Sequence, residues 1–224
     1  MKFKDLEHDV DSCMDVWIEF YSKVYPPFFE KYFDFSKIED KETSTQCKRW
    51  YIKLKDGVEQ KNDFPKFKMA GDCIFNFNHK KVDMLKKYIN TNDGLELLEY
   101  CAEQHHSFEN FAFMPITGGM NNQKGRQVLD RPDIHINEIN KYFNNENSTI
   151  FSNARGNKKA LEWYLSLFER SIKTYVEKVY LIDDEEFIFK SFLPFSDVIV
   201  CDENTAIQYM ELAKTFWEKR NIML

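Results

Sequence analysis

The chain has 224 residues, of which 43% are hydrophobic and 30% are charged. This composition excludes a disordered chain and a membrane protein built of apolar helices, and the net charge of −6 argues against a uniformly basic nucleic-acid-binding protein. The 21 Phe, 11 Tyr and 4 Trp predict a core built mainly on aromatic rings.

The N-terminus carries scattered charges and no apolar stretch of signal-peptide length. No run of the sequence approaches the roughly 18 apolar residues that a membrane-spanning helix needs. The cysteines are odd in number, widely spaced and free of C-x-x-C or zinc-finger spacing, which indicates reduced thiols. We therefore expect a soluble cytoplasmic protein that contacts no membrane and needs no cofactor. The five cysteines are Cys13, Cys47, Cys73, Cys101 and Cys201.

The first half of the chain predicts one helix and a small sheet. Residues 10–24 repeat apolar side chains at helical spacing until a Pro-Pro pair ends the pattern. Residues 33–45 are polar and typical of turns. The alternation of apolar and polar residues within 48–54, closed by an Asp-Gly pair, predicts a half-buried strand. Two further short strands are expected at 73–77 and 110–114.

Helical signals dominate the rest of the chain. One helix is expected over 80–90, and Asp93 is a plausible N-cap for the next. Residues 130–143 begin a helix with a proline in the first turn. The strongest apolar stripe runs from 159 to 181, and a closing helix is expected over 205–219.

These elements predict an α+β fold that is mostly helical with a small antiparallel sheet. No repeat, low-complexity tract or linker divides the sequence, so residues 1–224 are expected to form a single globular domain. Leu165, Phe168 and Ile172 continue the strongest stripe and should be nearly fully buried.

The loop-rich stretch His105–Arg126 is the most function-like part of the sequence. Its glycines permit a close approach of the backbone, so successive N–H groups there form a candidate nest for an anion, with two cations beside it. It lacks the spacing of a phosphate-binding P-loop. The alternative is an ordinary connection whose glycines serve only the turn. The candidate anion-binding residues are Gly118, Gly119, Asn121, Lys124 and Arg126.

Metal binding and acid–base catalysis are weaker alternatives. Cys101 and His105 stand four residues apart on one helix face, and Asp133 and His135 are further candidate ligands. Nothing in the sequence forces these groups together, and histidines at a helix C-terminus commonly complement the helix dipole. We therefore assign no metal site. A separate basic cluster of Arg155, Lys158 and Lys159 opens the helix predicted from 159, where a bound anion would offset the unfavourable dipole.

Three segments resemble an uncharacterised bacterial and phage-borne family with no assigned activity. They are 33–57, the run SFENFAFMPITGGMNNQKG (107–125) followed by DRPDIHINEINKYF (130–143), and the Phe-rich stretch 187–200. The resemblance implies a bacterial, phage-related origin and no particular function.

The run HSFENFAFMP followed by MNNQKG also resembles part of the HNH (ββα-metal) nuclease domain. The resemblance implies that Asn110 orients a catalytic histidine and that Asn121 or Asn122 approaches a divalent metal. The sequence departs from that family at the general base, because His79 lacks the acidic or histidine neighbour and His106 lies only four residues from Asn110.

From these patterns we expect a non-catalytic binding protein that uses the loop 105–126 to recognise an anionic group, a nucleic acid or a partner protein. The alternative is an HNH-like, metal-dependent nuclease, active or degenerate, in phage defence or a mobile element. Under that alternative the candidate catalytic residues are His106 and Asn110, and a divalent metal is the cofactor.

Overall fold

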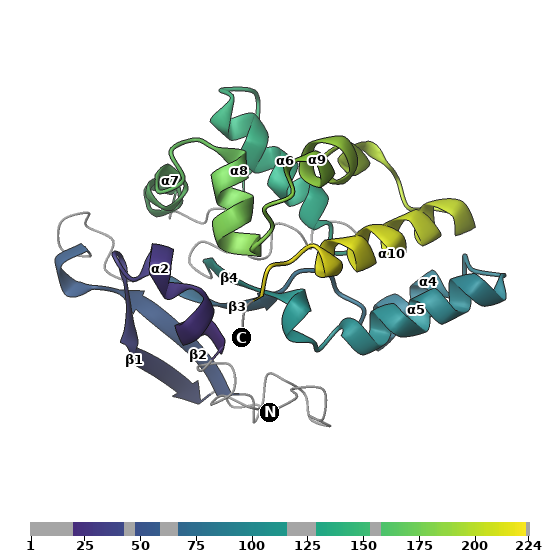
Figure 1. The fold of residues 1–224 in the computed structure, drawn as a ribbon, viewed down its shortest axis with the longest axis horizontal. Helices are drawn as coiled ribbons and strands as arrows, with labels where there is room; N and C mark the ends of the chain where they lie inside the picture. The colour runs from purple at the N-terminus through teal and green to yellow at the C-terminus, as the bar shows by residue number, and fades with distance from the viewer. Residues whose placement is uncertain (1–19, 43–47, 59–66, 116–128, 153–157, 223–224) are drawn as a thin grey trace.

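In the computed structural model the placement of residues 20–42, 48–58, 67–115, 129–152 and 158–222 is described, and the following account concerns these residues. They form a four-stranded antiparallel sheet and a larger set of helices (Figure 1). The expected α+β class, mostly helical with a small antiparallel sheet, is confirmed. In the described part of the chain, no helix combines the length and the apolar character needed to cross a membrane.

The strands lie in the order β1-β2-β3-β4, which follows the chain. Facing residues fix the register, with Ile52 opposite Met69 and Gly71 opposite Phe113. Position 71 requires glycine, because a Cβ atom there would lie 2.5 Å from the Tyr21 hydroxyl oxygen. The strands are β1 (Phe33–Glu42), β2 (Lys48–Leu54), β3 (Lys68–Cys73) and β4 (Phe111–Pro115).

Of the three predicted strands, two were confirmed and one was wrong, and a further strand lies where turns were predicted. Residues 33–42, expected to be turns, form β1, an edge strand whose register shifts between Phe33 and Ile38. The alternation of apolar and polar residues identifies β2 in the sequence. In β1 the irregularity, together with charges typical of an edge strand, hides such an alternation. The strand expected at 73–77 lies earlier, at 68–73, because Phe75 and Phe77 leave the sheet to pack against aromatic rings of the last helix. The strands at 48–54 and 110–114 are present as β2 and β4.

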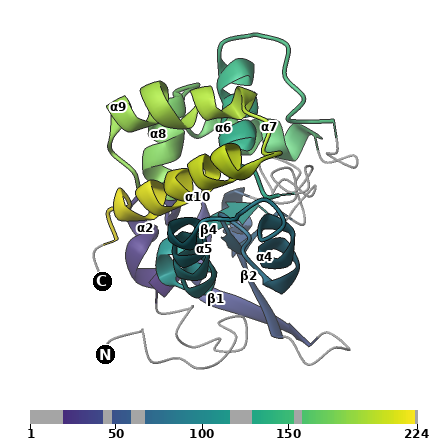
Figure 2. The same ribbon diagram turned by 90° about the vertical axis from the view of Figure 1, so that its right-hand side faces the viewer.

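The helices form two groups around the sheet. Figure 2 shows the last helix, α10, between the α4–α5 pair and the group that contains α6, α8 and α9. Residues 20–24 are also helical. The further helices of the described chain are α2 (Pro26–Phe29), α4 (His79–Leu85), α5 (Asn92–Gln104), α6 (Pro132–Phe143), α7 (Lys158–Ser166), α8 (Ile172–Tyr175), α9 (Glu185–Phe187) and α10 (Glu203–Glu218). The 3₁₀ turns η3 (Phe108–Asn110) and η7 (Pro194–Asp197) and the π turns η5 (Val176–Tyr180) and η6 (Ile188–Phe192) complete them.

The single helix predicted over 159–181 is wrong. The helix ends with α7, Glu169 and Arg170 adopt left-handed φ values of 52° and 58°, and a new helix begins as α8. The break has a visible cause, because the Arg170 side chain donates to the carbonyl oxygens of Tyr142 and Phe143 at the end of α6. Helical spacing cannot reveal a turn that is fixed by contacts to a distant helix.

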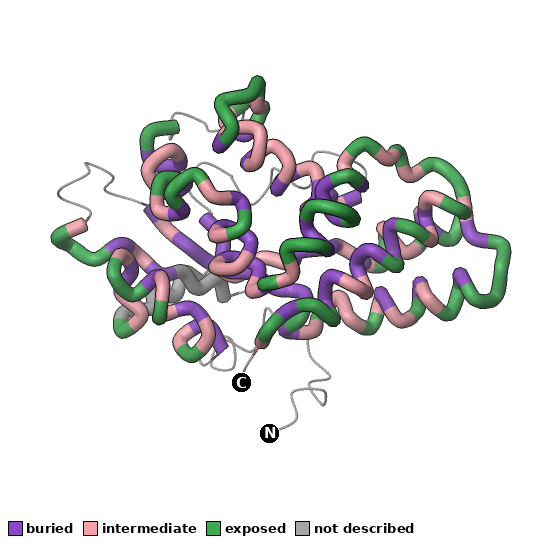
Figure 3. Tube along the Cα trace, turned by 45° about the horizontal axis from the view of Figure 1, so that its top comes forward, coloured by how far each residue is buried: buried purple, intermediate pink, exposed green. Residues whose placement is uncertain are grey.

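Burial along this segment nevertheless follows the prediction. Leu165 and Phe168 are 0% exposed and Ile172 is 7% exposed, so all three belong to the core. The core is built on aromatic rings, as the composition predicts. The ring of Phe168, for example, contacts those of Phe28, Tyr164 and Tyr175, with centroid distances below 5.5 Å. Buried segments run through the centre of the trace in Figure 3 and exposed ones lie at its outer helices and loops.

The N-cap of α5 is not the residue that the sequence predicts. Asp93 lies inside the helix and is not its N-cap, and the N-cap residue Thr91 makes no side-chain capping bond. The carboxylate of Glu203, in the first turn of α10, accepts hydrogen bonds from the backbone N–H groups of Asn90 and Thr91, each at 2.9 Å. A side chain 112 residues away in sequence from Thr91 therefore caps this helix.

Replacing Glu203 with Gln is expected to flatten the loss of stability in acid. The N–H groups of Asn90 and Thr91, with the Thr91 hydroxyl, lower the pKa of Glu203 to about 2, against roughly 4.3 for an unfolded glutamate. A depressed folded-state pKa stabilises the fold above the unfolded value, and this contribution is lost as the pH falls from about 4.3 towards 2. Urea unfolding measured at several pH values should show a shallower acid limb for Glu203→Gln. The control is Glu211→Gln, an exposed position on the same helix, which should keep the wild-type acid limb.

No disulfide joins the described cysteines, Cys73, Cys101 and Cys201, to one another. Cys101 is buried, with its thiol 3.8 Å from the Met210 carbonyl oxygen, whereas Cys201 is exposed. Burial first, and the charge of Glu211 second, raise the pKa of the Cys101 thiol to about 12. Cys13 and Cys47 lie outside the described residues.

Cys101 is expected to be inert towards thiol reagents in the folded protein. At pH 8 a thiol with that pKa is ionised in roughly one molecule in ten thousand, and only the thiolate reacts. Timed alkylation followed by peptide mass spectrometry should modify Cys201 at least about a hundredfold faster than Cys101. In denaturant the two rates should converge. Equal rates in the native protein would show that Cys101 is accessible and that α5 does not pack on α10 as described.

Candidate functional site

The described part of the predicted functional stretch centres on a buried asparagine. Asn110 ends η3, immediately before β4, and is 0% exposed. Its side-chain oxygen accepts hydrogen bonds from the Phe75 N–H at 2.9 Å and from the Trp217 indole N–H at 3.0 Å. Its amide nitrogen donates to the carbonyl oxygens of Phe75 at 2.7 Å and His105 at 2.9 Å.

These four bonds use the full capacity of the Asn110 amide. They join the segment after β3, the turn at the end of α5, and α10. The backbone carbonyl of Asn110 also accepts from the N–H of Ile74 at 2.6 Å. Asn110 is therefore a structural junction, and its side chain has no remaining group with which to orient a catalytic histidine.

The two histidines near this junction differ in environment. The Nδ1 atom of His105 accepts from the Phe77 N–H at 3.4 Å, so this ring helps hold the same segment. His106 is exposed, and its ring centroid lies 4.5 Å from that of His105. Of the two candidate catalytic residues, His106 faces solvent and Asn110 does not.

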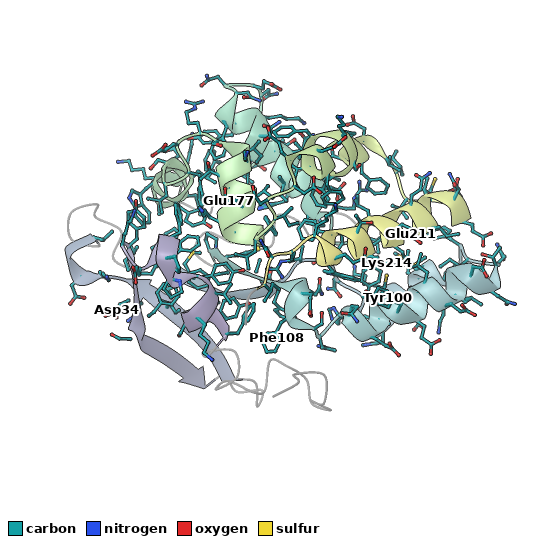
Figure 4. The ribbon with its side chains drawn as sticks, viewed as in Figure 1. Asp34, Tyr100, Phe108, Glu177, Glu211 and Lys214 are labelled. Atoms are coloured by element: carbon teal, nitrogen blue, oxygen red, sulfur yellow. The ribbon has the colours of Figure 1, made fainter. Side chains whose placement is uncertain are left out.

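A buried arginine that the sequence analysis did not identify supports the turn from the other side. Arg220, just after α10, is 7% exposed and donates to the carbonyl oxygens of Phe108 at 3.0 Å and Glu109 at 2.6 Å. Figure 4 marks Phe108 at this turn. Arg220 also donates to the Tyr180 carbonyl at 2.7 Å and the Tyr25 hydroxyl at 3.3 Å. Burial raises the pKa of Tyr25, and the charge of Arg220 partly offsets that effect. An arginine at a helix end gives no periodic signal, so no sequence pattern marks this role.

A second buried cation lies just after the loop. Arg131, 3% exposed, pairs with Asp133, 0% exposed, at 2.6 Å. The same guanidinium donates to the carbonyl oxygens of Phe195 and Val198, each at 2.9 Å, and lies 5.0 Å from the centre of the Phe195 ring. The chain just before α6 is thus fixed to η7, through Phe195, and to Val198, the residue that follows η7. The carboxylate of Asp133, a candidate metal ligand in the sequence, is engaged by this pair.

All five candidate anion-binding residues lie outside the described residues. These are Gly118, Gly119, Asn121, Lys124 and Arg126. The described part of the stretch 105–126 is not the loop that was expected, because residues 108–110 form η3 and residues 111–115 form the buried strand β4. The described chain resumes at the buried Leu129. The candidate anion-binding residues therefore lie between core residues on both sides in sequence.

The candidate metal ligands are not brought together. Cys101 bonds to the Met210 carbonyl oxygen, His105 binds the Phe77 N–H, and Asp133 pairs with Arg131. Within the described ranges there is no group of three or more His, Cys, Asp or Glu side chains arranged to hold a metal ion. His79, the candidate nuclease base, is exposed at the start of α4.

Three further features, namely the predicted basic cluster, a cleft and a cation–π pair, give no additional binding site among the described residues. Lys158, in the predicted basic cluster, pairs with Glu162 at 3.5 Å and lies 5.6 Å from the centre of the Phe151 ring, while Arg155 lies outside the described residues. A cleft between α8 and α9 has a volume of about 10 Å³, which suits at most one water molecule. Tyr100 and Lys214, labelled in Figure 4, face each other between α5 and α10, with the ammonium 5.9 Å from the ring centre.

Comparisons with protein-family models, with curated proteins and with solved structures found no match to this chain. They therefore support neither the resemblance to an uncharacterised bacterial and phage-borne family nor the resemblance to HNH nucleases.

Proposed function

We propose that this protein is a non-catalytic binding protein that uses the loop 105–126 to recognise an anionic group on a small ligand, a nucleic acid or a partner protein. The observation that carries the proposal is the fixation of the described chain on both sides of the candidate residues 118–126. Asn110 holds the entry through four hydrogen bonds, and Arg131 holds the exit through Asp133 and two carbonyl oxygens. Binding loops are commonly positioned by a rigid scaffold in this way.

The sequence between these anchors supplies the chemistry. Gly118 and Gly119 allow a close approach of the backbone, Asn121 tolerates left-handed conformations, and Lys124 and Arg126 supply positive charge. The commitment of the Asn110 amide to the fold argues against the nuclease alternative, since that amide would have to orient the catalytic histidine. A cytoplasmic location and a phage or mobile-element setting belong to the same proposal.

The double substitution Lys124→Ala with Arg126→Ala is expected to weaken anion binding while leaving the melting temperature nearly unchanged. Substitutions that remove no packing or capping contact change stability by about 0.5 kcal/mol or less. Binding of inorganic pyrophosphate and of a short single-stranded DNA can be measured by calorimetry over a range of salt concentrations. Affinity should fall as salt rises, and for the single-stranded DNA the double variant should reduce the salt slope by about 1.4, since each phosphate contact contributes about 0.7.

The matched control removes two other cations. Lys86→Ala with Lys87→Ala changes the net charge by the same amount at two exposed positions at the end of α4. Equal weakening by both double variants would indicate a general electrostatic effect and would contradict the loop assignment. If the loop variant melts several degrees lower, Lys124 and Arg126 are structural.

The nuclease alternative is tested with the same proteins. Wild type is incubated with DNA and RNA in the presence of Mg²⁺ or Mn²⁺. Cleavage that disappears in His106→Ala would favour the nuclease, because His106 is exposed and its removal leaves the core intact. Absence of cleavage with either metal would retire that alternative.

A further inference from the structure

Residues 198–201, with the sequence Val-Ile-Val-Cys, cross from η7 to α10 on the outer side of the molecule (Figure 1). Their burial alternates: Val198 and Val200 pack against the core, whereas Ile199 and Cys201 face solvent. Ile199 is 76% exposed, more than the other exposed large hydrophobic residues, Leu95 and Phe189. A period of two is typical of an extended strand.

Val198, which begins this segment, and Asp202, which directly follows it, both have extended backbone geometry. Val198 has φ −82° and ψ 130°, and Asp202 has φ −146° and ψ 178°. The carbonyl of Val198 accepts a hydrogen bond from Arg131 at 2.9 Å, and the N–H of Cys201 donates to the Thr205 hydroxyl at 3.1 Å. The segment is therefore preorganised, which lowers the entropic cost of binding a partner.

The middle of the segment offers unused backbone groups. Among the described residues, none hydrogen-bonds to the N–H or C=O of Ile199. In an extended chain the N–H and C=O of one residue point to the same edge, so Ile199 can exchange two hydrogen bonds with a single residue of an added strand. The apolar Ile199 side chain lies beside that edge.

The charges around the segment identify the occupant. Asp197 and Asp202 flank it; Asp197 is exposed and has no ion pair with another described residue, and Thr205 lowers the pKa of Asp202. An antiparallel second copy of this chain would bring the Asp197 end of one copy against the Asp202 end of the other. Like charges at such positions are unfavourable. A strand with basic residues at both ends is complementary instead.

We propose that residues 198–201 are a docking edge for an extended peptide segment of a partner protein. That segment carries a β-branched or aromatic residue opposite Ile199 and a Lys or Arg on each side of it. Backbone hydrogen bonds provide affinity, and the flanking acids select the partner, as in other cases of strand addition. The site is separate from the loop 105–126.

The experiment uses the full chain, labelled with ¹⁵N, and three synthetic peptides. The first is Lys-Val-Thr-Val-Thr-Val-Lys, the second replaces both lysines with Glu, and the third carries an N-methyl group on the central valine. The first peptide should shift the Ile199 and Val200 amide resonances and slow the exchange of the Ile199 N–H. The Glu and N-methyl peptides should bind at least about tenfold more weakly, a loss of about 1.4 kcal/mol.

Variants of the protein separate the two contributions. Ile199→Ser should weaken the first peptide about tenfold or more, whereas Leu95→Ser, at another exposed hydrophobic position, should leave its affinity unchanged. Asp197→Asn with Asp202→Asn removes both charges and keeps an N-cap side chain on α10. This double variant should abolish the preference for Lys over Glu peptides.

Three results would overturn the proposal. The first is an absence of resonance shifts at 198–201 with the lysine peptide at millimolar concentration. The second is binding that is the same in Ile199→Ser and wild type. The third is a concentration-dependent dimer, detected by sedimentation velocity, that Ile199→Ser dissociates; it would identify a second copy of the chain as the occupant.

Discussion

Replacing Phe168 with alanine is expected to lower the free energy of unfolding by about 3–5 kcal/mol. The ring is 0% exposed and lies against Phe28, Tyr164 and Tyr175, with ring centroids 4.9–5.4 Å apart. It also sits at the turn between α7 and α8, so its removal leaves a cavity where two helices and α2 meet. Urea unfolding followed by tryptophan fluorescence measures the loss.

The matched control is Phe189→Ala, which removes the same side chain from a position that is 43% exposed. This variant should lose about 1 kcal/mol or less, because its ring leaves little cavity. Similar losses at both positions would show that the core does not centre on Phe168. A full loss at Phe168 without any change in the slope of the transition would confirm that the folded state keeps its compactness.

The part of the fold that the sequence predicts is the part governed by local pattern. The closing helix, expected over 205–219, is present as α10, whose Asp202 and Thr205 form a capping box that fixes its start. The helix over 130–143 is present as α6, with Pro132 in its first turn. In both cases the signal lies within a few residues of the element that it defines.

The features that the sequence does not reveal depend on distant contacts. The helix predicted over 159–181 is interrupted because Arg170 bonds to carbonyls at the end of α6. The cap of α5 comes from Glu203, on another helix. The burial of Arg131 and Arg220 also follows from carbonyl groups that only the folded chain brings together.

The candidate site also combines residues that the sequence marks with partners that only the folded chain brings together. The run from His105 to Asn110 is polar and contains two histidines and an asparagine, and this composition indicates function as readily as structure. The structure assigns the Asn110 amide to the fold because its partners, Phe75 and Trp217, lie 35 and 107 residues away in sequence. A local resemblance to a catalytic motif carries no information about these partners.

Asn110→Ala is therefore expected to be a stability variant. The substitution leaves two buried donors, the N–H groups of Phe75 and the Trp217 indole, and two carbonyl acceptors without their partner. Each unsatisfied buried group costs about 1–3 kcal/mol, so the free energy of unfolding should fall by about 4 kcal/mol or more. Thermal unfolding should show a decrease in Tm of roughly 8–16 °C for a chain of this size.

The comparison with Asn204→Ala separates this effect from the loss of any asparagine. Asn204 is exposed in the first turn of α10, and its removal should change stability by about 0.5 kcal/mol or less. If Asn110→Ala melts like wild type, the four-bond junction is absent in solution and the residue regains its place as a catalytic candidate. If it melts far below wild type, any activity lost in this variant reflects unfolding. His106→Ala, at an exposed position, then becomes the substitution that decides between binding and catalysis.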